Sequence, residues 1–411
     1  MIDKRWLLVG SVWLCLAGGC QSGEVNESSA ASPTTTFQQD LDTLRRQGDV
    51  LVLRDGPRQV LVSPLYQGRV MTSTAAGDTA AGFGYLDYRT ITSDSINRQF
   101  GSYGGEDRFW IAPQGGPYTL FFNPGDPQDF EHWFTPRPLN AEPFALVSAD
   151  STTVRMRKQM KLTNYSRTRF DVTVDRTVRL LKRADVERAL NAFLPAGVRW
   201  VAFESDNQLT NSGTARWSSD TGLLSIWILG MFKPTARTTA ILPVNRAPEV
   251  NEYFRDQLDE LPGRKLHVTK RAVYFRTDGD YIGKIGIAPD YAIGAPQQGW
   301  LGSYSPDTQT LTLVQYVSQP QPGDVYLNSS WDKEADPYAG DVINVYNDGN
   351  LTRTPRPVRT FYELETSAPT RALKPGESLR HRHRTFHFLG DRAVLNRISL
   401  AALGVTLEGI E

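Results

Sequence analysis

One stretch in the first half of the chain restricts the possible folds more than any other. Within residues 168–181, Phe170, Val172, Val174 and Val178 alternate with mainly polar side chains. A period of two is that of a β-strand, whose side chains point to opposite faces in turn. Long antiparallel strands suit two large sheets stacked face to face, so this stretch predicts an all-β sandwich.

Further strand signals dominate the rest of the chain, separated by clusters of Gly, Pro, Asn and Asp. They lie at residues 50–53, 59–62, 118–122, 154–162, 199–203, 222–229, 310–316, 361–365 and 381–388. Two short helices are predicted among them, at residues 37–47 and 184–194. Because no internal repeat or linker follows residue 36, we predict a single domain over residues 37–411.

The first 20 residues are typical of an export signal. Lys4 and Arg5 precede an apolar run over residues 6–17, which is too short and wrongly flanked for a retained membrane span. The ending Leu16-Ala-Gly-Gly-Cys20 resembles a bacterial lipobox, which implies removal of residues 1–19 and lipidation of Cys20. An ordinary cleaved signal is the alternative. Gln21 favours sorting to the outer membrane, so we expect a lipid-anchored protein of the bacterial cell envelope.

Residues 20–36 are polar and cannot bury a core, which predicts a flexible tether. The only two cysteines are Cys15, inside the predicted signal, and Cys20, so no thiol is left for disulfides, zinc or catalysis. The charges balance at 45 basic and 45 acidic side chains without a basic run, which argues against nucleic acid as a partner. We expect a monomer that meets the membrane only through its lipid.

Two segments near the C-terminus carry the side chains best suited to chemistry. Alternation places Glu363 and Glu365 on one face of a strand, and it places His381, His383 and His387 on one face of the next. Residues 374–377, Lys-Pro-Gly-Glu, predict a turn between them. The pattern therefore predicts a hairpin-like unit with acids on one arm and imidazoles on the other.

The same region resembles a known superfamily. Leu364-Glu365-Thr366, followed by Leu-x-Pro-Gly-Glu at residues 373–377, is similar to the C-terminal signature of the galactose mutarotases, or aldose epimerases. A broader resemblance, to an uncharacterised bacterial lipoprotein family with the mutarotase-like fold, is carried by residues 104–110, 222–231, 284–286 and 344–349. It implies a galactose mutarotase-like β-supersandwich of two large, mostly antiparallel sheets with a few short helices. It also implies that Glu365 is the catalytic base.

Mutarotation needs an acid as well, because the ring oxygen must be protonated as the ring opens. The superfamily carries this acid in an Asn-His-x-Tyr-Phe motif, which would fall in the polar stretch 204–213, where this chain has Asn207 but no histidine. We predict His383 as the acid, with His132 or His381 as alternatives. Glu363 either raises the pKa of Glu365 by like-charge repulsion or pairs with Arg382 or Arg384.

The other predicted ligand contacts come from the first third of the chain. The resemblance places Arg69 near the sugar, and two glycines at the start of the block 104–110 let the backbone approach a ligand closely. Burying acids is costly, so we expect Glu106 and Asp107 at a wet cleft wall. Internal ion pairs and core packing are the alternatives. The predicted site comprises Arg69, Glu106, Asp107, Arg108, Trp110, His132, Asn207, Glu363, Glu365, His381 and His383.

A cation and three functions complete the predictions. Asp336, Asp341 and residues 347–349 concentrate oxygen donors that suit Ca²⁺, although such sequences are foremost turns; no other metal or cofactor is predicted. The leading hypothesis is a lipid-anchored protein that binds a mono- or oligosaccharide. One alternative is an aldose epimerase or another carbohydrate-active enzyme with Glu365 as its general base. The other is a structural or interaction protein of the envelope.

Overall fold

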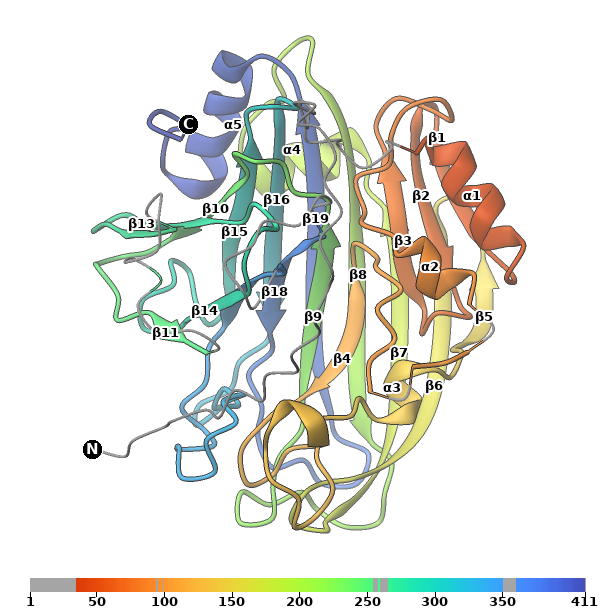
Figure 1. Cartoon of the computed structure of the whole chain (residues 1–411), viewed down its shortest axis with the longest axis vertical. Helices are drawn as coiled ribbons and strands as arrows, with labels where there is room; N and C mark the ends of the chain where they lie inside the picture. Colours follow the sequence, from red (N-terminus) through yellow and green to blue (C-terminus); the bar gives the residue numbers. More distant parts are fainter. Residues whose placement is uncertain are drawn as a thin grey trace, which may run out of the picture.

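The structure is a computed structural model that describes residues 35–93, 95–97, 99–253, 258, 265–349 and 360–410 (Figure 1). The predicted signal, Cys20 and all but the last two residues of the tether 20–36 lie outside these residues. None of the helices within the described part is both long and apolar enough to cross a membrane.

The larger of two extended sheets has ten strands, all paired antiparallel. These strands are β5 (Ala145–Ala149), β6 (Thr153–Thr163), β7 (Arg169–Leu180), β8 (Arg199–Asn211), β10 (Thr239–Pro243), β12 (Leu266–Val268), β13 (Ala272–Arg276), β15 (Gln298–Ser305), β16 (Thr310–Ser318) and β19 (Ser378–Leu389). They follow the order β12-β13-β10-β15-β16-β19-β8-β7-β6-β5. The stretch that alternates so clearly in the sequence is β7, near one edge of this sheet.

The second extended sheet has six strands, again antiparallel, and a small sheet of three strands lies beside the other two (Figure 1). The six are β4 (Arg108–Ala112), β9 (Ser225–Phe232), β11 (Asn251–Glu252), β14 (Gly283–Ile287), β17 (Ile343–Asn347) and β18 (Tyr362–Ser367), in the order β11-β14-β17-β18-β9-β4. The three are β1 (Leu51–Asp55), β2 (Arg58–Ser63) and β3 (Arg69–Thr74). Two large antiparallel sheets with few helices confirm the predicted fold class.

The main core fills the space between the two large sheets. Phe109 and Ile228 of the six-stranded sheet belong to the same apolar cluster as Val172 and Phe203 of the ten-stranded sheet, and all four are buried. Apolar burial of this kind is the main favourable term in folding. The sandwich therefore has one inner side, shared by both sheets, and two outer sides.

Helices are short and lie outside the sheets. They are α1 (Phe37–Arg45), α2 (Tyr88–Ile91), the 3₁₀ turn η1 (Phe130–His132), α3 (Arg137–Asn140), α4 (Arg183–Leu190) and α5 (Arg392–Leu403). The predicted helices at 37–47 and 184–194 correspond to α1 and α4. The sequence did not predict α5, which buries Leu395 and Ile398 against Leu311 and Phe388 on the outer side of the ten-stranded sheet.

Two predictions of local structure are wrong. Residues 118–122 form a loop, in which the Leu120 N–H donates to the Pro113 carbonyl, although Phe121 and Phe122 are buried as in a strand. More importantly, β18 and β19 are not a hairpin. β18 pairs with β17 and β9, whereas β19 pairs with β16 and β8 in the other large sheet.

Candidate functional site

Because β18 and β19 belong to different sheets, the predicted acids and imidazoles lie on different sides of β18. Glu363 and Glu365 point to the side of the six-stranded sheet that faces away from the ten-stranded sheet, which we call the outer face. Thr366, on the opposite side of β18, contacts His381 and His383 between the two sheets. We call the polar groups there the inter-sheet layer; they are Glu106, Asp107, Arg176, Asn207, Thr366, His381, His383 and His387.

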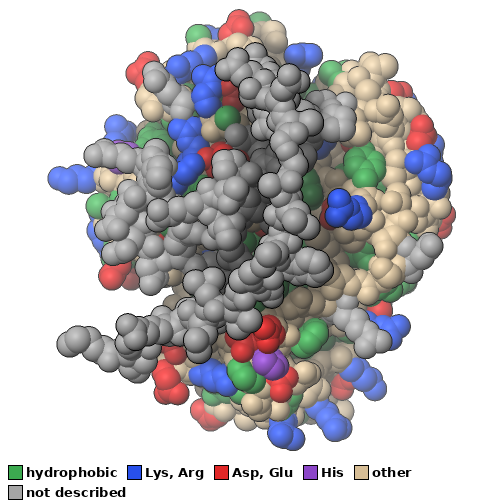
Figure 2. Space-filling model, viewed as in Figure 1, with side chains coloured by type: hydrophobic (Ala, Val, Ile, Leu, Met, Phe, Trp, Pro, Cys, Tyr) green, Lys and Arg blue, Asp and Glu red, His purple; other side chains and the backbone are tan. Residues whose placement is uncertain are grey.

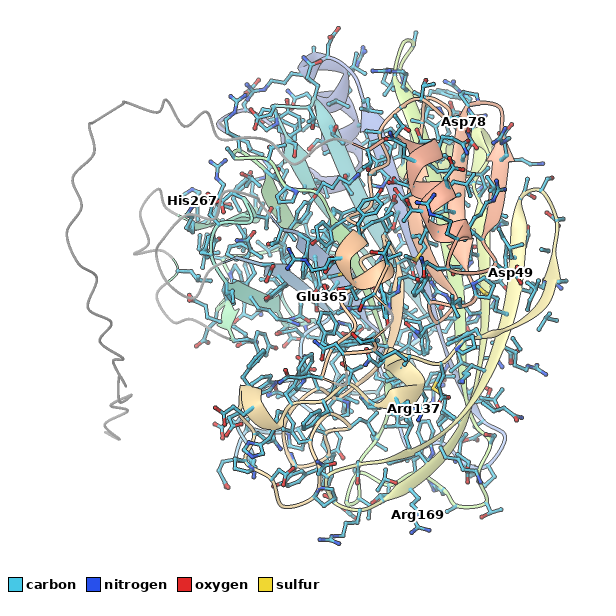
Figure 3. All side chains as sticks on the ribbon, turned by 45° about the vertical axis from the view of Figure 1, so that its right-hand side comes forward. Asp49, Asp78, Arg137, Arg169, His267 and Glu365 are labelled. Carbon is cyan, nitrogen blue, oxygen red and sulfur yellow. The ribbon has the colours of Figure 1, made fainter. Side chains whose placement is uncertain are left out.

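Glu365 is the most completely buried acid of the outer face, and it lies in the middle of the molecule in Figure 3. Its Oε2 accepts one hydrogen bond from Trp227 Nε1 at 3.0 Å and another from Lys284 Nζ at 2.9 Å. Both donors stabilise the ionised carboxylate. Its Oε1 accepts no hydrogen bond from an N–H or hydroxyl group of the described residues.

Glu363 has a different environment two residues away. Its Oε1 accepts a hydrogen bond from Arg108 Nη2 at 2.9 Å, with both side chains almost fully buried. Burial raises the pKa of Glu363 to about 7, and the adjacent Glu365 raises it further through its charge and a hydrogen bond, against the opposing effect of Arg108. Glu363 thus adjoins Glu365, but its arginine partner is Arg108 and not the predicted Arg382 or Arg384, and Arg384 pairs with Glu204 in the other large sheet.

Arg108 has more hydrogen-bonding capacity than the described groups use. Its guanidinium lies 4.1 Å from the ring centre of Trp110 and 5.2 Å from that of Phe100, which places it among aromatic faces. Burial lowers its pKa, although Glu363 and Glu365 oppose this. Its Nε and Nη1 are buried and have no hydrogen-bond partner among the described residues.

Lys284 links the two acids to a second polar group on the same face. Its Nζ lies 4.6 Å from the ring centre of Trp227 and 5.8 Å from that of Tyr253. Asp341 accepts hydrogen bonds from Tyr253 and Asn251, and burial raises its pKa to about 6. The outer face thus carries alternating charges and rings across β4, β9, β18 and β14.

A group of aromatic side chains borders this charged row. Trp110 lies 5.5 Å from Trp227 and 5.0 Å from Phe121 between ring centres, and Trp133 stacks on Phe121 at 6.1 Å. Trp110 and Trp133 are buried, and neither indole N–H has a partner among the described residues. Trp110 lies beside Arg108 on the outer face, whereas Glu106 and Asp107 of the same block lie in the inter-sheet layer.

His381 and His383 of the inter-sheet layer are neutral, hydrogen-bonded core residues. Thr366 Oγ1 lies 2.8 Å from His381 Nε2 and 2.9 Å from His383 Nδ1, and Ser318 Oγ lies 2.9 Å from His381 Nδ1. Burial lowers the pKa of His381 to about 3 and that of His383 to about 4. His383 contacts Thr366 on the side of β18 opposite to Glu365, so His383 is not beside Glu365.

The acids of the block 104–110 also differ from their predicted position at a wet wall. Asp107 and Glu106 are fully buried. Asp107 Oδ1 forms an ion pair with Arg176 Nη2, and Glu106 Oε2 lies 2.8 Å from His387 Nε2. The reason lies in the fold, because Arg176 on β7 and His387 on β19, both far away in sequence, are the partners of these carboxylates and offset the cost of their burial.

Three further predicted ligand contacts lie away from the outer face or are already engaged. Asn207, in the inter-sheet layer, accepts a hydrogen bond from Arg176 Nη1 at 2.5 Å. Arg69 is buried and donates to the Gly104 carbonyl and to Gln67 Oε1. His132 is part of η1, where its ring lies 2.6 Å from Asp129 on the surface.

The predicted calcium donors do not converge. Asp341 is bound by the side chains of the outer face, and Asp336 Oδ1 accepts from the Tyr338 N–H in a turn. Within the described part of the chain, no group of three or more His, Cys, Asp or Glu side chains suits a metal ion.

Several site residues were missed by the sequence reasoning. Lys284 and Asn344, whose side chain lies 3.4 Å from Asp341, stand in blocks that carried the family resemblance, but neither was given a role. Tyr253 had no signal at all. Its contact with Asp341 depends on the pairing of β11 with β14, which only the folded sheet reveals.

Figure 2 shows one face of the molecule, on which Lys and Arg side chains are interspersed with Asp and Glu over the visible described surface. Around the outer face itself the charges are also paired, because Arg108 meets Glu363 and Lys284 meets Glu365. Recognition there would rest on individual hydrogen bonds and ring faces.

Comparison with known proteins gives a family and a fold similarity. A family model described as "Family of unknown function (DUF6786)" matches residues 35–411. No functionally curated protein matches the chain. The chain is similar to the solved structures of three bacterial proteins, each matched over more than four fifths of its length.

A candidate aldose 1-epimerase of Escherichia coli K12 has 13% identity and a TM-score of 0.48, with 82% of this chain and 98% of that chain covered. A galactose mutarotase-like protein of Lactobacillus casei ATCC 334 has 8% identity and a TM-score of 0.45, with 82% and 100% covered. A galactose mutarotase related enzyme of Lactobacillus acidophilus has 9% identity and a TM-score of 0.44, with 83% and 98% covered.

Proposed function

We propose that this chain, which belongs to the family of unknown function DUF6786, binds a carbohydrate on the outer face of its six-stranded sheet. The observation that carries the proposal is a set of unused polar atoms beside aromatic rings. Glu365 Oε1 and Arg108 Nε and Nη1 are buried without partners among the described N–H, hydroxyl and carbonyl groups. Buried polar groups are rarely left unsatisfied, so each such atom needs an explanation.

A sugar would satisfy these atoms together. Its hydroxyls donate to a carboxylate such as Glu365 and accept from a guanidinium such as Arg108. The apolar C–H faces of a sugar ring fit against Trp227 and Trp110, whose rings flank the two charges. The two ion pairs are already formed, so they would hold the ligand-binding atoms in place without being rearranged.

Proton transfer at the anomeric carbon is the second candidate function, and one observation favours it. Glu365, which the resemblance identifies as the base, is held at Oε2 by Trp227 and Lys284, and its Oε1 accepts from no N–H or hydroxyl group of the described residues. A base needs such a free oxygen in order to take a proton from a hydroxyl.

The proposal is tested by titrating the purified protein with a panel of free aldoses and short oligosaccharides, using calorimetry and saturation-transfer NMR. We expect at least one sugar to bind. In Glu365→Gln the affinity should fall by about 10-fold or more, as expected for a lost hydrogen bond to a charged group of about 1.5–3 kcal/mol.

The matched control is Glu204→Gln. Glu204 is another buried glutamate and is paired with Arg384, but it belongs to β8 of the other large sheet. Equal loss of affinity in both variants, or no binding by any sugar in the panel, would show that the outer face is not a carbohydrate site.

We further propose that Cys20 is lipidated and anchors the domain to the outer membrane of a bacterial envelope. The support is the lipobox-like ending of the apolar segment, Leu16 to Cys20, with Gln21 after it. Metabolic labelling with a fatty-acid analogue should mark the wild type and not Cys20→Ala. An unlabelled wild type, or a labelled Cys20→Ala variant, contradicts the anchor.

A further inference from the structure

We propose that Glu363 and Glu365 act as an acid–base pair on an aldose, in which Glu363 protonates the ring oxygen while Glu365 removes the proton of the anomeric hydroxyl. This inference rests on the proposed function, because it requires the outer face to bind a sugar. It assigns to Glu363 the acid that the sequence lacks at its expected place, where no histidine occurs.

The position of the two carboxyls fits this reaction. They point to the same face from alternate residues of β18, and they are close enough for a hydrogen bond to each other. The ring oxygen and the anomeric hydroxyl oxygen of an aldose are both bonded to one carbon, so their acid and base must also be adjacent. Glycosidases instead separate their two carboxyls by about 5–9.5 Å, which disfavours hydrolysis here.

The different environments of the two carboxyls favour Glu365 as the base and Glu363 as the acid. Glu365 accepts two hydrogen bonds at one oxygen, from Trp227 and Lys284, which favours its ionised form. Glu363 accepts one, from Arg108, and it faces the negative charge of Glu365. The pKa of Glu363 is raised to about 7, so about half of the molecules carry this proton at pH 7 and most carry it below pH 6.

The described charged and titratable groups around Glu363 are consistent with its role as the acid. Arg108 on β4 and Lys284 on β14 lower its pKa, whereas burial and Glu365 raise it. Tyr346 on β17 is half-buried and has a pKa well above its usual value, so it stays neutral. A protonated Glu363 can also donate to Glu365 Oε1, which would satisfy that oxygen until a sugar hydroxyl replaces it.

The histidines cannot supply the acid. His381 and His383 lie on the other side of β18, and the pKa of each is lowered by burial, to about 3 and about 4. His132 is on the surface, in η1. Glu363 is therefore the described acid that is both beside Glu365 and protonated near neutral pH.

The proton transfers balance. Glu365 takes the proton of the anomeric hydroxyl, whose O–H electrons form the carbonyl as the bond between the anomeric carbon and the ring oxygen breaks. The ring oxygen takes the proton of Glu363. After the carbonyl group rotates, the ring closes with both transfers reversed, which gives the other anomer and restores a carboxylate at Glu365 and a carboxylic acid at Glu363.

The experiment measures anomer exchange by NMR for D-galactose, D-glucose, D-mannose, D-xylose and L-arabinose, with binding measured on the same samples. Wild type should accelerate exchange of a sugar that it binds, with a rate that falls as the pH rises through about 7 because Glu363 then loses its proton. Glu363→Gln should lower the rate by about 10²-fold or more and abolish this pH dependence. Glu204→Gln should leave both unchanged.

Three outcomes separate the two proposals. If a sugar binds but no exchange is accelerated, or if Glu363→Gln keeps the rate and its decline above pH 7, the acid–base pair is refuted and the binding site stands. If no sugar binds, both proposals are wrong. Should Glu363→Gln not fold, the wild-type profile decides alone: a rate that stays constant between pH 6 and 8 overturns the role of Glu363.

Discussion

The outer face and the inter-sheet layer contain the same kinds of side chain, but they differ in what surrounds them. In the inter-sheet layer, Asp107 and Arg176 are enclosed by two sheets, with each side chain fully buried. On the outer face, Glu363 and Lys284 have slight exposure, at 5% and 4%, and no second large sheet covers them. Ion pairs of the same kind are therefore enclosed by two large sheets in one region and lie against only one large sheet in the other.

The two regions also differ in the direction in which their pKa values are shifted. In the inter-sheet layer His381 and His383 have lowered pKa values and are kept neutral, whereas on the outer face the pKa values of Glu363 and Asp341 are raised. Burial causes both effects, since it disfavours whichever form carries charge. The following substitutions should separate the two regions, beginning with the largest expected effect.

Asp107→Ala should destabilise the protein by about 3–5 kcal/mol, because it leaves Arg176 buried without its counter-ion. This reverses the small effect that a position at a wet wall would imply. Urea unfolding followed by tryptophan fluorescence measures the change. A loss within about 0.5 kcal/mol, as for a surface position, would remove the distinction between the two regions.

Trp227→Phe should lower the free energy of unfolding by a smaller amount, about 1.5–3 kcal/mol. It removes the indole N–H that donates to Glu365 at 3.0 Å but keeps an aromatic ring. We expect sugar affinity to fall by a comparable amount, as judged by calorimetry. Trp217→Phe is the control, since Trp217 packs on Phe170 in the main core. If Trp217→Phe weakens binding as much, the ligand does not contact the outer face.

The histidines should make the protein less stable in acid. The unfolded chain takes up protons on His381 and His383 as the pH falls below about 6.5, whereas the folded chain does so only near pH 3 and 4. Their stabilisation is thus complete above pH 6.5 and is lost as the pH falls toward 3. Urea unfolding at pH 7 and pH 5 should show a smaller acid loss for His383→Gln than for wild type. An unchanged loss would mean that His383 titrates normally.

Glu363 should have the opposite effect over a neighbouring range. Its pKa is about 7 when folded and 4.5 in the reference state, so between these values the folded chain holds a proton that the unfolded chain has lost. Relative to Glu363→Gln, wild type should therefore lose stability as the pH rises from 4.5 to 7. Parallel stability curves for the two proteins would place the pKa of Glu363 near its ordinary value.

His132→Ala should have the smallest effect. His132 and Asp129 form an exposed pair, and such pairs contribute little. We expect unfolding free energy to change by less than about 0.5 kcal/mol and sugar affinity to stay the same. A lost affinity would extend the ligand site to η1.

The sequence predicted the strands well because alternation is a local property. It could not predict which sheet each strand joins, and this decides which side chains meet. Glu365 and His383 looked like partners across a hairpin, yet β18 and β19 pair with different strands. Arg108 and Glu363 are 255 residues apart, so their contact had no local signal.

Burial of polar residues was the second limit. A run of acids with an arginine reads as a wet surface unless distant partners are known, and Asp107 finds Arg176 69 residues away. The helix α5 was also not predicted from the sequence; it begins shortly after the end of β19. Family blocks carried more site information than single motifs, because Trp227 and Lys284 stand within them.

The most direct test compares the two regions in one spectrum. ¹⁵N-labelled protein is titrated with a binding aldose while the Trp227 indole N–H and the imidazoles of His381 and His383 are followed by NMR. We predict that the Trp227 indole resonance shifts as the sugar is added and that the shift saturates over the concentration range set by the sugar affinity. The imidazole resonances of His381 and His383 should stay unchanged. Shifts of the imidazoles with an unchanged Trp227 indole would place the ligand in the inter-sheet layer and contradict the account.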